Sequence, residues 1–133
     1  MKTVSRILLM SAGSLLMLSA YIPWVAPKEA DELANPYKDN AAETVAGKKL
    51  YTTYCVVCHG EKGKGDGPAG ISLMPRPADH SSMKVQSQTD GAIFWKITNG
   101  RAPMASYKNF TEEQRWQLVN YIRVLGQAPV KKK

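Results

Sequence analysis

The stretch from Cys55 to His59, Cys-Val-Val-Cys-His, restricts the fold more than any other part of the sequence. It contains both cysteines of the chain and one of its two histidines, in the pattern C-x-x-C-H. This spacing is the attachment signature of a c-type haem, in which Cys55 and Cys58 bind the porphyrin and His59 binds the iron. The sequence therefore predicts one covalent haem c here and a fold arranged around it.

The beginning of the chain has the composition of an export segment. Lys2 and Arg6 precede the uncharged residues 7–26, and Trp24 lies where an interfacial aromatic residue is expected. Such a stretch is typical of a signal peptide and is also just long enough to span a bilayer. We therefore predict that residues 1–26 are a signal peptide or an N-terminal membrane anchor. The haem domain would then lie on the periplasmic side of the bacterial inner membrane, with membrane association through residues 7–26.

The remainder of the chain divides by composition into a linker, one domain and a tail. Residues 27–40 have mixed charges and two prolines, which is typical of a linker. Residues 41–126 form the predicted domain, and residues 127–133 form a basic tail. Lysine and arginine total 18 against 11 acidic residues, which favours protein partners with acidic docking surfaces. Because the basic residues are scattered, we expect no nucleic-acid binding.

Two stretches on either side of the middle of the domain carry the signals of helices. Asn40 is a suitable N-cap for a first helix that runs to Tyr54, with apolar residues recurring on one face. Thr89 or Asp90 is expected to cap a second, strongly apolar helix that Gly100 ends. Between these helices the glycines and prolines predict irregular structure.

A third helix is expected at the carboxyl end of the domain. Thr111 and Gln114 have the spacing of a capping box, and Gly126 ends the periodic stretch that follows. No segment alternates as a strand does, so the predicted class is all-α, with three or more short helices and long loops. Such a chain has too little core for its size unless a bulky cofactor fills the centre, which a haem would do.

The ligand on the far side of the iron decides the chemistry that a haem protein carries out. Met104 is the preferred candidate because it lies in an irregular loop that follows a helix. A thioether would raise the reduction potential and suit an electron carrier, whereas an open site would admit small molecules. The alternatives are Met74, Met83, His80 or an open sixth position.

Three functions from different classes remain on this basis. A haem with two permanent ligands would be a one-electron carrier that cycles between Fe(II) and Fe(III) without catalysing a reaction of its own. A haem whose sixth ligand can leave would be a small-molecule sensor or catalyst. A zinc-binding structural module would instead use Cys55, Cys58, His59 and His80 as ligands.

Several segments, in order, resemble the class I monohaem cytochromes c. They are AGKKLY, CVVCH, a loop with GDGP, a short helix ending in NG, the methionine loop RAPMASY and the terminal LVNYIRVL. The resemblance covers about Gly47 to Leu125. The phrases PRPADHS, GRAPMASYK and EEQRWQLVNYIR are further similar to monohaem cytochrome c subunits of bacterial respiratory chains, such as that of alternative complex III.

The resemblance implies roles for particular residues. His59 and Met104 would be the axial ligands of the iron, and Cys55 and Cys58 the thioether anchors. The carbonyl of Pro68 would accept a hydrogen bond from the His59 ring and orient it.

The resemblance also implies a helix crossing and an electron-carrier function in a respiratory chain. Gly47 and Tyr51 of the first helix would cross Tyr121 of the last, where a glycine allows close approach. Independently of the resemblance, side chains with a charged fork or a polar tip suit the neighbourhood of haem propionates. The candidates are Arg76, Trp95 and Tyr107.

Overall fold

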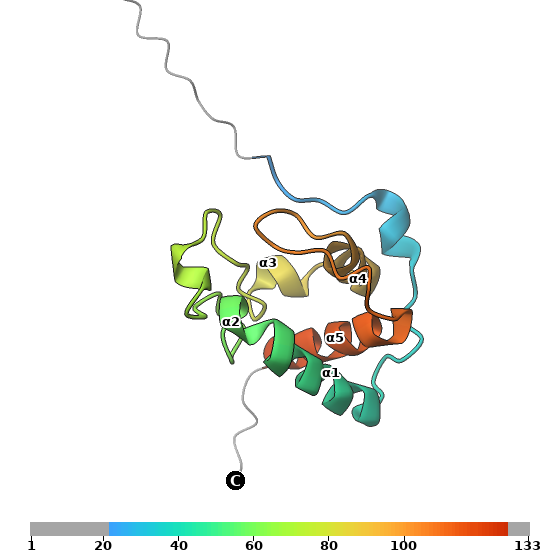
Figure 1. The fold of residues 1–133 in the computed structure, drawn as a ribbon. Coiled ribbons are helices and arrows are strands. Elements are labelled where there is room, and N and C mark those ends of the chain that lie inside the picture. Colours follow the sequence, from blue (N-terminus) through green and yellow to red (C-terminus); the bar gives the residue numbers. More distant parts are fainter. Residues whose placement is uncertain (1–21, 128–133) are drawn as a thin grey trace, which may run out of the picture.

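The computed structural model describes residues 22–127 as a bundle of helices joined by loops (Figure 1). The elements in chain order are η1 (Lys28–Glu32), α1 (Ala41–Tyr54), α2 (Val56–His59), η2 (Gly70–Ser72), α3 (Met83–Gln86), α4 (Asp90–Asn99) and α5 (Glu112–Leu125). Over residues 22–127 the β-type pairing consists of one isolated bridge, between Arg101 and Met104. The all-α class is therefore confirmed.

The structure does not describe the two ends of the chain, where most of the predicted leader and tail lie. Residues 1–21 and 128–133 lie outside the described residues, so the signal-peptide or anchor prediction and most of the tail stay predictions. Within residues 22–127, no helix is long and apolar enough to cross a bilayer.

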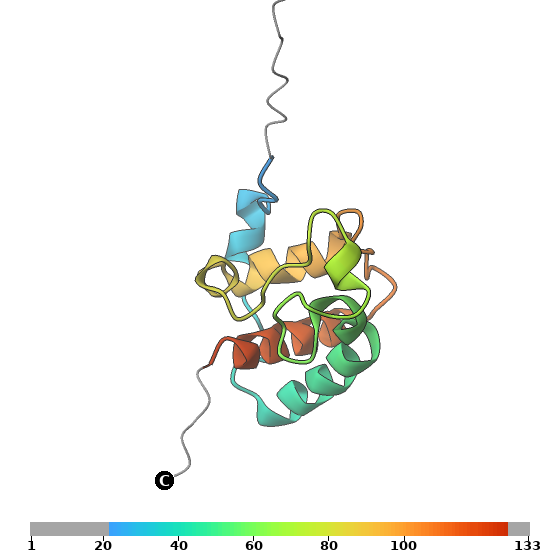
Figure 2. The same cartoon turned by 90° about the vertical axis from the view of Figure 1, so that its left-hand side faces the viewer.

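The long helices α1 and α5 cross in close contact, and α4 lies on the other side of α5 (Figure 2). At the crossing, a Cβ atom on Gly47 would overlap the backbone carbonyl of Gln117. Nearby, the rings of Tyr51 and Tyr121 meet edge to face, with centroids 5.1 Å apart. The expected crossing of the first and last helices is present, with the glycine at the point of closest approach.

The hydrophobic core is centred on α5, against which buried side chains of α1, α3 and α4 pack. The Phe94 ring stacks on the Trp116 indole with centroids 4.0 Å apart, and Leu118 and Val119 of α5 are fully buried. Burying side chains of this size contributes roughly 1.5–3 kcal/mol each, which makes this contact a main source of stability. The apolar segment in α4 thus packs inward as its composition predicted.

The segment predicted as a linker packs on the domain. Ala30 of η1 is 3% exposed, and a Cβ atom on Gly91 of α4 would overlap its carbonyl oxygen. Asn35 then donates from Nδ2 to Oδ1 of Asn120 at 2.8 Å. The contact depends on two small residues and on side-chain amides, which produce no apolar periodicity. Residues 27–40 are therefore part of the folded unit, which differs from the linker expectation.

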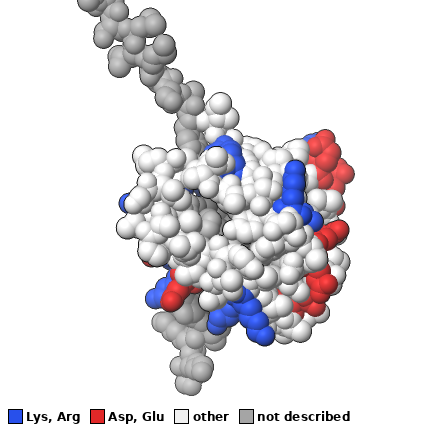
Figure 3. All heavy atoms as spheres, in the orientation of Figure 1, with Lys and Arg blue, Asp and Glu red and all other residues white. Residues whose placement is uncertain are grey.

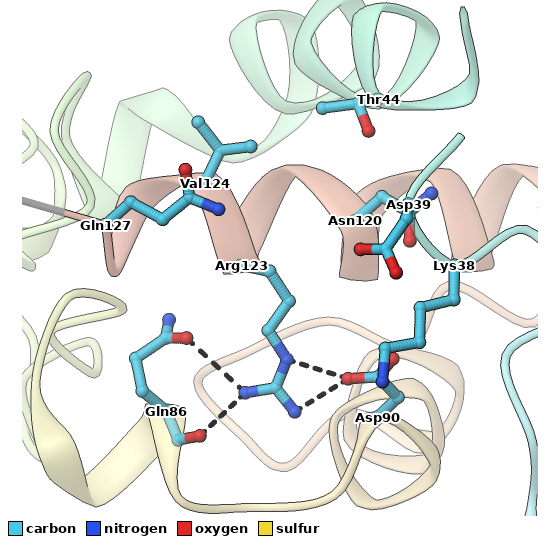
Figure 4. Close-up of a pocket in the computed structure, with 9 residues that line it drawn as sticks. All are labelled: Lys38, Asp39, Thr44, Gln86, Asp90, Asn120, Arg123, Val124 and Gln127. Carbon is cyan, nitrogen blue, oxygen red and sulfur yellow. Dashed lines mark hydrogen bonds and ion pairs between the residues drawn. The ribbon is translucent and has the colours of Figure 1, made fainter. Parts of the chain in front are cut away.

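A polar cluster joins α3, α4 and α5 around Arg123 (Figure 4). The guanidinium donates from Nε to Asp90 at 2.7 Å, and from its two Nη atoms to the carbonyls of Gln86 at 2.9 Å and Gln88 at 2.6 Å. These bonds use most of the donors that an arginine offers. The hollow in Figure 4 contains none of the predicted site residues, and we interpret it as a structural junction.

The helix caps follow the sequence signals. Oδ1 of Asn40 accepts from the backbone N–H of Ala42 at 3.0 Å, and Thr89, rather than Asp90, caps α4. At α5, Oγ1 of Thr111 accepts from the N–H of Gln114 at 3.1 Å, and the Gln114 side chain accepts from the N–H of Thr111 at 2.9 Å. The predicted capping box is confirmed.

Replacing Thr111 with alanine should lower the free energy of unfolding by about 1 kcal/mol, because a helix N–H loses its acceptor. Urea unfolding of the haem-loaded protein measures the change. Thr111→Ser, which keeps the oxygen, is the matched control and should stay within a few tenths of a kcal/mol of the parent. Equal losses in both variants would contradict a capping role for the hydroxyl.

Candidate haem site

The C-x-x-C-H stretch lies at the junction of α1 and α2. Cys55 ends α1 and begins α2, with its N–H bonded to the carbonyl of Tyr51 at 2.8 Å. The N–H of His59 in turn bonds to the Cys55 carbonyl at 2.8 Å. Both thiols are free, without a disulfide. The hydrogen-bonded turn therefore presents two thiols and an imidazole on one short rigid frame.

The thiols lie at the edge of the core, close to one aromatic side chain. Burial, with a smaller effect of Cys58, raises the pKa of the Cys55 thiol to about 12, so this group is neutral at physiological pH. Burial and then the nearness of both cysteines raise the pKa of Tyr107. The Tyr107 hydroxyl also donates to the carbonyl of Tyr54 at 3.3 Å. Of the three predicted propionate neighbours, Tyr107 is thus brought to the attachment site.

The His59 ring is buried and has one defined partner. Its Nδ1 lies 3.1 Å from the carbonyl oxygen of Ala78. A carbonyl can only accept, so Nδ1 carries the hydrogen and Nε2 presents a lone pair. Burial lowers the pKa of His59, which also favours the neutral ring. A neutral imidazole oriented through its other nitrogen is the form that binds a metal.

The acceptor for His59 differs from the one that the resemblance implied. The carbonyl of Pro68 was expected in this role, but the structure gives Nδ1 the carbonyl of Ala78. The glycine-rich loop folds back on α2, where Gly67 and Ala69 donate to the carbonyls of Cys58 and Val57. Pro68 is exposed between them. The acceptor comes instead from Ala78, in the irregular segment that follows this loop.

The methionines differ in burial. Met74 is 87% exposed and Met83 78% exposed, whereas Met104 is half-buried. The N–H of Met104 donates to the Arg101 carbonyl at 2.9 Å within its loop. Tyr107 ties the same loop to α4, through its N–H to the Ile97 carbonyl at 3.1 Å. Among the three methionines that the structure describes, Met104 has the burial and the anchored loop expected of a ligand.

His80, the alternative imidazole, lies against His59. The two rings stack with centroids 4.1 Å apart and an interplanar angle of 19°. Axial ligands approach an iron from opposite directions, so a ring stacked on the face of His59 is poorly placed to be the opposite ligand. Burial, followed by the effect of His59, lowers the pKa of His80 to about 3, which keeps the ring neutral.

The other candidates are dispersed. Arg76 is exposed, and Trp95 is half-buried on α4, the helix that leads into the Met104 loop, so their placement near propionates stays a prediction. Within residues 22–127, no three His, Cys, Asp or Glu side chains gather as a metal cluster would require. The geometry thus gives the zinc alternative, with its four ligands, no support.

One contact at the site was missed by the sequence analysis. The Trp24 ring lies 5.3 Å from the Arg101 guanidinium and 5.6 Å from Nζ of Lys96. Arg101 also donates to the carbonyl of Ile22 at 3.2 Å. The position of Trp24 was interpreted only in terms of a membrane interface. The one sequence feature that could have indicated this contact is the positive charge of Arg101, three residues before Met104.

Figure 3 shows how charge is distributed on one face of the molecule. Lysine and arginine side chains are dispersed there, and a broad uncharged area covers the side that carries α2 in Figure 1. Lys64 is partly compensated by Asp79, with Nζ 3.7 Å from Oδ2. On this face, electrostatic attraction to a partner would therefore come from scattered charges rather than from one basic patch.

Comparison with protein-family models matches residues 42–122 to the family described as cytochrome c oxidase, cbb3-type, subunit III. The chain belongs to this family of c-type cytochromes. The match covers α1, the C-x-x-C-H turn, the Met104 loop and most of α5, and it confirms the class I cytochrome c resemblance.

Two proteins are similar to this chain over most of its length. The chain is 28% identical over 106 residues to the cytochrome bc1 complex cytochrome c subunit of Corynebacterium efficiens, a match that covers 74% of this chain and 32% of that protein. A chain of the reducing HAO-like protein complex of Kuenenia stuttgartiensis superposes with a TM-score of 0.62 and 27% identity, over 71% of this chain and 50% of that one. This cytochrome c chain thus spans about a third of the length of the Corynebacterium efficiens protein and half of the length of the Kuenenia stuttgartiensis chain.

The residues present fit the haem c that membership of the family implies. Cys55 and Cys58 are free thiols on one turn, and the neutral His59 offers Nε2. The glycine-rich loop bonds directly to the backbone of this turn, with the N–H of Gly65 on the His59 carbonyl at 2.8 Å. Hydrogen bonds within the protein therefore hold the attachment turn in place.

Proposed function

We propose that the protein is a one-electron carrier of a bacterial respiratory chain, which holds one covalent haem c with His59 and Met104 as axial ligands. The observation that carries the proposal is the burial and hydrogen bonding of the His59 ring. Its ring is buried, its Nδ1 is fixed on the carbonyl of Ala78, and its Nε2 has a lone pair available. Met104 is the half-buried methionine in an anchored loop.

When bound, the haem would supply an iron that exchanges one electron between Fe(II) and Fe(III). The task of the protein is to keep its own groups unchanged during that exchange. Ala78 holds the His59 tautomer, and Tyr107 ties the Met104 loop to the end of α1. Because each group has a partner within the folded domain, a change of charge at the site would require little rearrangement.

The proposed partners are respiratory redox proteins or complexes on the periplasmic side of the inner membrane. The Corynebacterium efficiens relative is named as a subunit of a cytochrome bc1 complex, which supports this setting. The excess of 18 lysines and arginines over 11 acids favours acidic docking surfaces on such partners. Redox encounters of this type bury less than about 1,200 Å² in total. Membrane association through residues 7–26 belongs to the same proposal.

The purified protein should retain a haem stain after denaturation, contain one iron per chain and titrate as a single one-electron couple. The reduced protein should not bind carbon monoxide immediately, because Met104 would occupy the sixth position. Absorption spectra before and after carbon monoxide addition measure this. Immediate and complete binding would favour the sensor or catalyst alternative, and loss of the haem stain on denaturation would reject covalent attachment.

A further inference from the structure

We propose that His80 is a positioning residue for the axial ligand, fixing the plane of the His59 ring by stacking on its face. This inference rests on the proposed role of His59 as an iron ligand. The two rings are nearly parallel, at 19°, with centroids 4.1 Å apart. At this separation the rings are in van der Waals contact, so rotation of one ring requires displacement of the other.

The backbone of His80 is held on both sides. Its N–H donates to the carbonyl of Gly63 at 2.6 Å, which connects it to the loop that wraps the attachment turn. Its own carbonyl accepts from Nε2 of Gln86 at 2.6 Å, and Gln86 also donates to the carbonyl of Ile122 in α5. His80 is therefore fixed relative to both the loop and the last helix.

The ring of His80 is held by a hydrogen-bonded relay through Tyr51. The Tyr51 hydroxyl lies 3.2 Å from the carbonyl of Gly60 and 3.3 Å from Nδ1 of His80. The carbonyl can only accept, so the hydroxyl donates to Gly60 and its oxygen accepts from Nδ1–H of His80. Tyr51 is 1% exposed, so water does not compete for these bonds. The relay ends at Gly60, the residue that follows His59.

The two restraints on His59 are complementary. The hydrogen bond to Ala78 fixes one edge of the ring and sets its tautomer, but a single bond leaves freedom to rotate about the axis toward the acceptor. The stack with His80 opposes that rotation. The orientation of the imidazole plane relative to the porphyrin determines how the ligand orbitals overlap with those of the iron. His80 would thereby influence the spectrum and the potential without touching the iron.

The test compares His80→Ala, His80→Phe and Tyr51→Phe in the full-length, haem-loaded protein. Proton NMR of the ferric state reports the spread of the haem methyl shifts, which depends on the imidazole plane, and a redox titration reports the potential. We expect His80→Ala to change the spread and shift the potential. His80→Phe, which keeps a flat ring, should restore most of the parent spread. Tyr51→Phe, which removes only the hydroxyl, should produce a smaller change in the same direction.

The control is Ser87→Ala, at an exposed residue on the same stretch of chain, which should leave both measurements unchanged. An unaltered spread of methyl shifts in folded His80→Ala would overturn the inference, as would a spread equally altered in His80→Phe. If His80→Ala does not fold, the Tyr51→Phe spectrum decides, and an unchanged one rejects the relay. Absence of covalent haem in the parent would instead reject the proposed function, which separates the two failures.

Discussion

Replacing Met104 with alanine is expected to abolish the thioether-ligated low-spin spectrum and to lower the reduction potential. A thioether stabilises reduced iron, so its loss favours the oxidised form. Axial ligands set haem potentials over a range of about 0.8 V, and we expect a decrease on the order of 0.1 V or more. The reduced variant should also bind carbon monoxide at once. Absorption spectra and a redox titration measure these changes.

The two other methionines within residues 22–127 provide matched controls for this experiment. Met74 and Met83 are 87% and 78% exposed, so their replacement by alanine should leave the spectrum and the potential of the parent unchanged. A native spectrum in Met104→Ala, or a change in Met74→Ala or Met83→Ala, would show that another residue is the sixth ligand. Covalent attachment should survive in all three variants because it depends on Cys55 and Cys58.

Replacing Gly47 with alanine should destabilise the protein, although helix propensity alone favours alanine by about 1 kcal/mol. The new Cβ atom would overlap the backbone carbonyl of Gln117, and α1 and α5 would have to move apart. Overpacking costs typically 1–3 kcal/mol, and more where a backbone must shift. We therefore expect a net loss of roughly 2 kcal/mol in the free energy of unfolding, measured by urea titration.

The control for this variant is Lys48→Ala, which introduces the same side chain at an exposed position of the same helix. It should change the free energy of unfolding by no more than about 0.5 kcal/mol. A Gly47→Ala variant as stable as the parent would contradict the close crossing of α1 and α5. Because the crossing lies one turn from Tyr51, the haem spectrum should be recorded alongside the unfolding curve.

Local signals predicted the long helices well. Asn40 and the pair Thr111 and Gln114 cap α1 and α5 as expected, because a cap depends on residues close together in sequence. The short helix α3 was not predicted, since four residues are too few to produce a periodic pattern. The helix crossing came from the resemblance rather than from the periodicity of either helix.

The contacts between distant segments were harder to predict. The sequence did not indicate Ala78 as the acceptor for His59, because every residue has a backbone carbonyl. Only the path of the loop determines which carbonyl lies next to the His59 ring. Similarly, η1 packs on α4 through Ala30 and Gly91, whose small size leaves no hydrophobic signal. The sequence indicated His80 only as an alternative metal ligand, because its stack on His59 depends on how two distant segments meet in three dimensions.

The contact between Trp24 and Arg101 gives the domain a mechanical asymmetry. Residues 22–24 meet the domain at the loop that contains Met104, before the chain reaches η1 or α1. A force applied to the chain at Ile22 would therefore act on Arg101, which is bridged to Met104, and on Lys96 of α4. The turn that carries Cys55, Cys58 and His59 follows α1, further along the chain. Tension on this segment would thus bear on the loop that contains Met104.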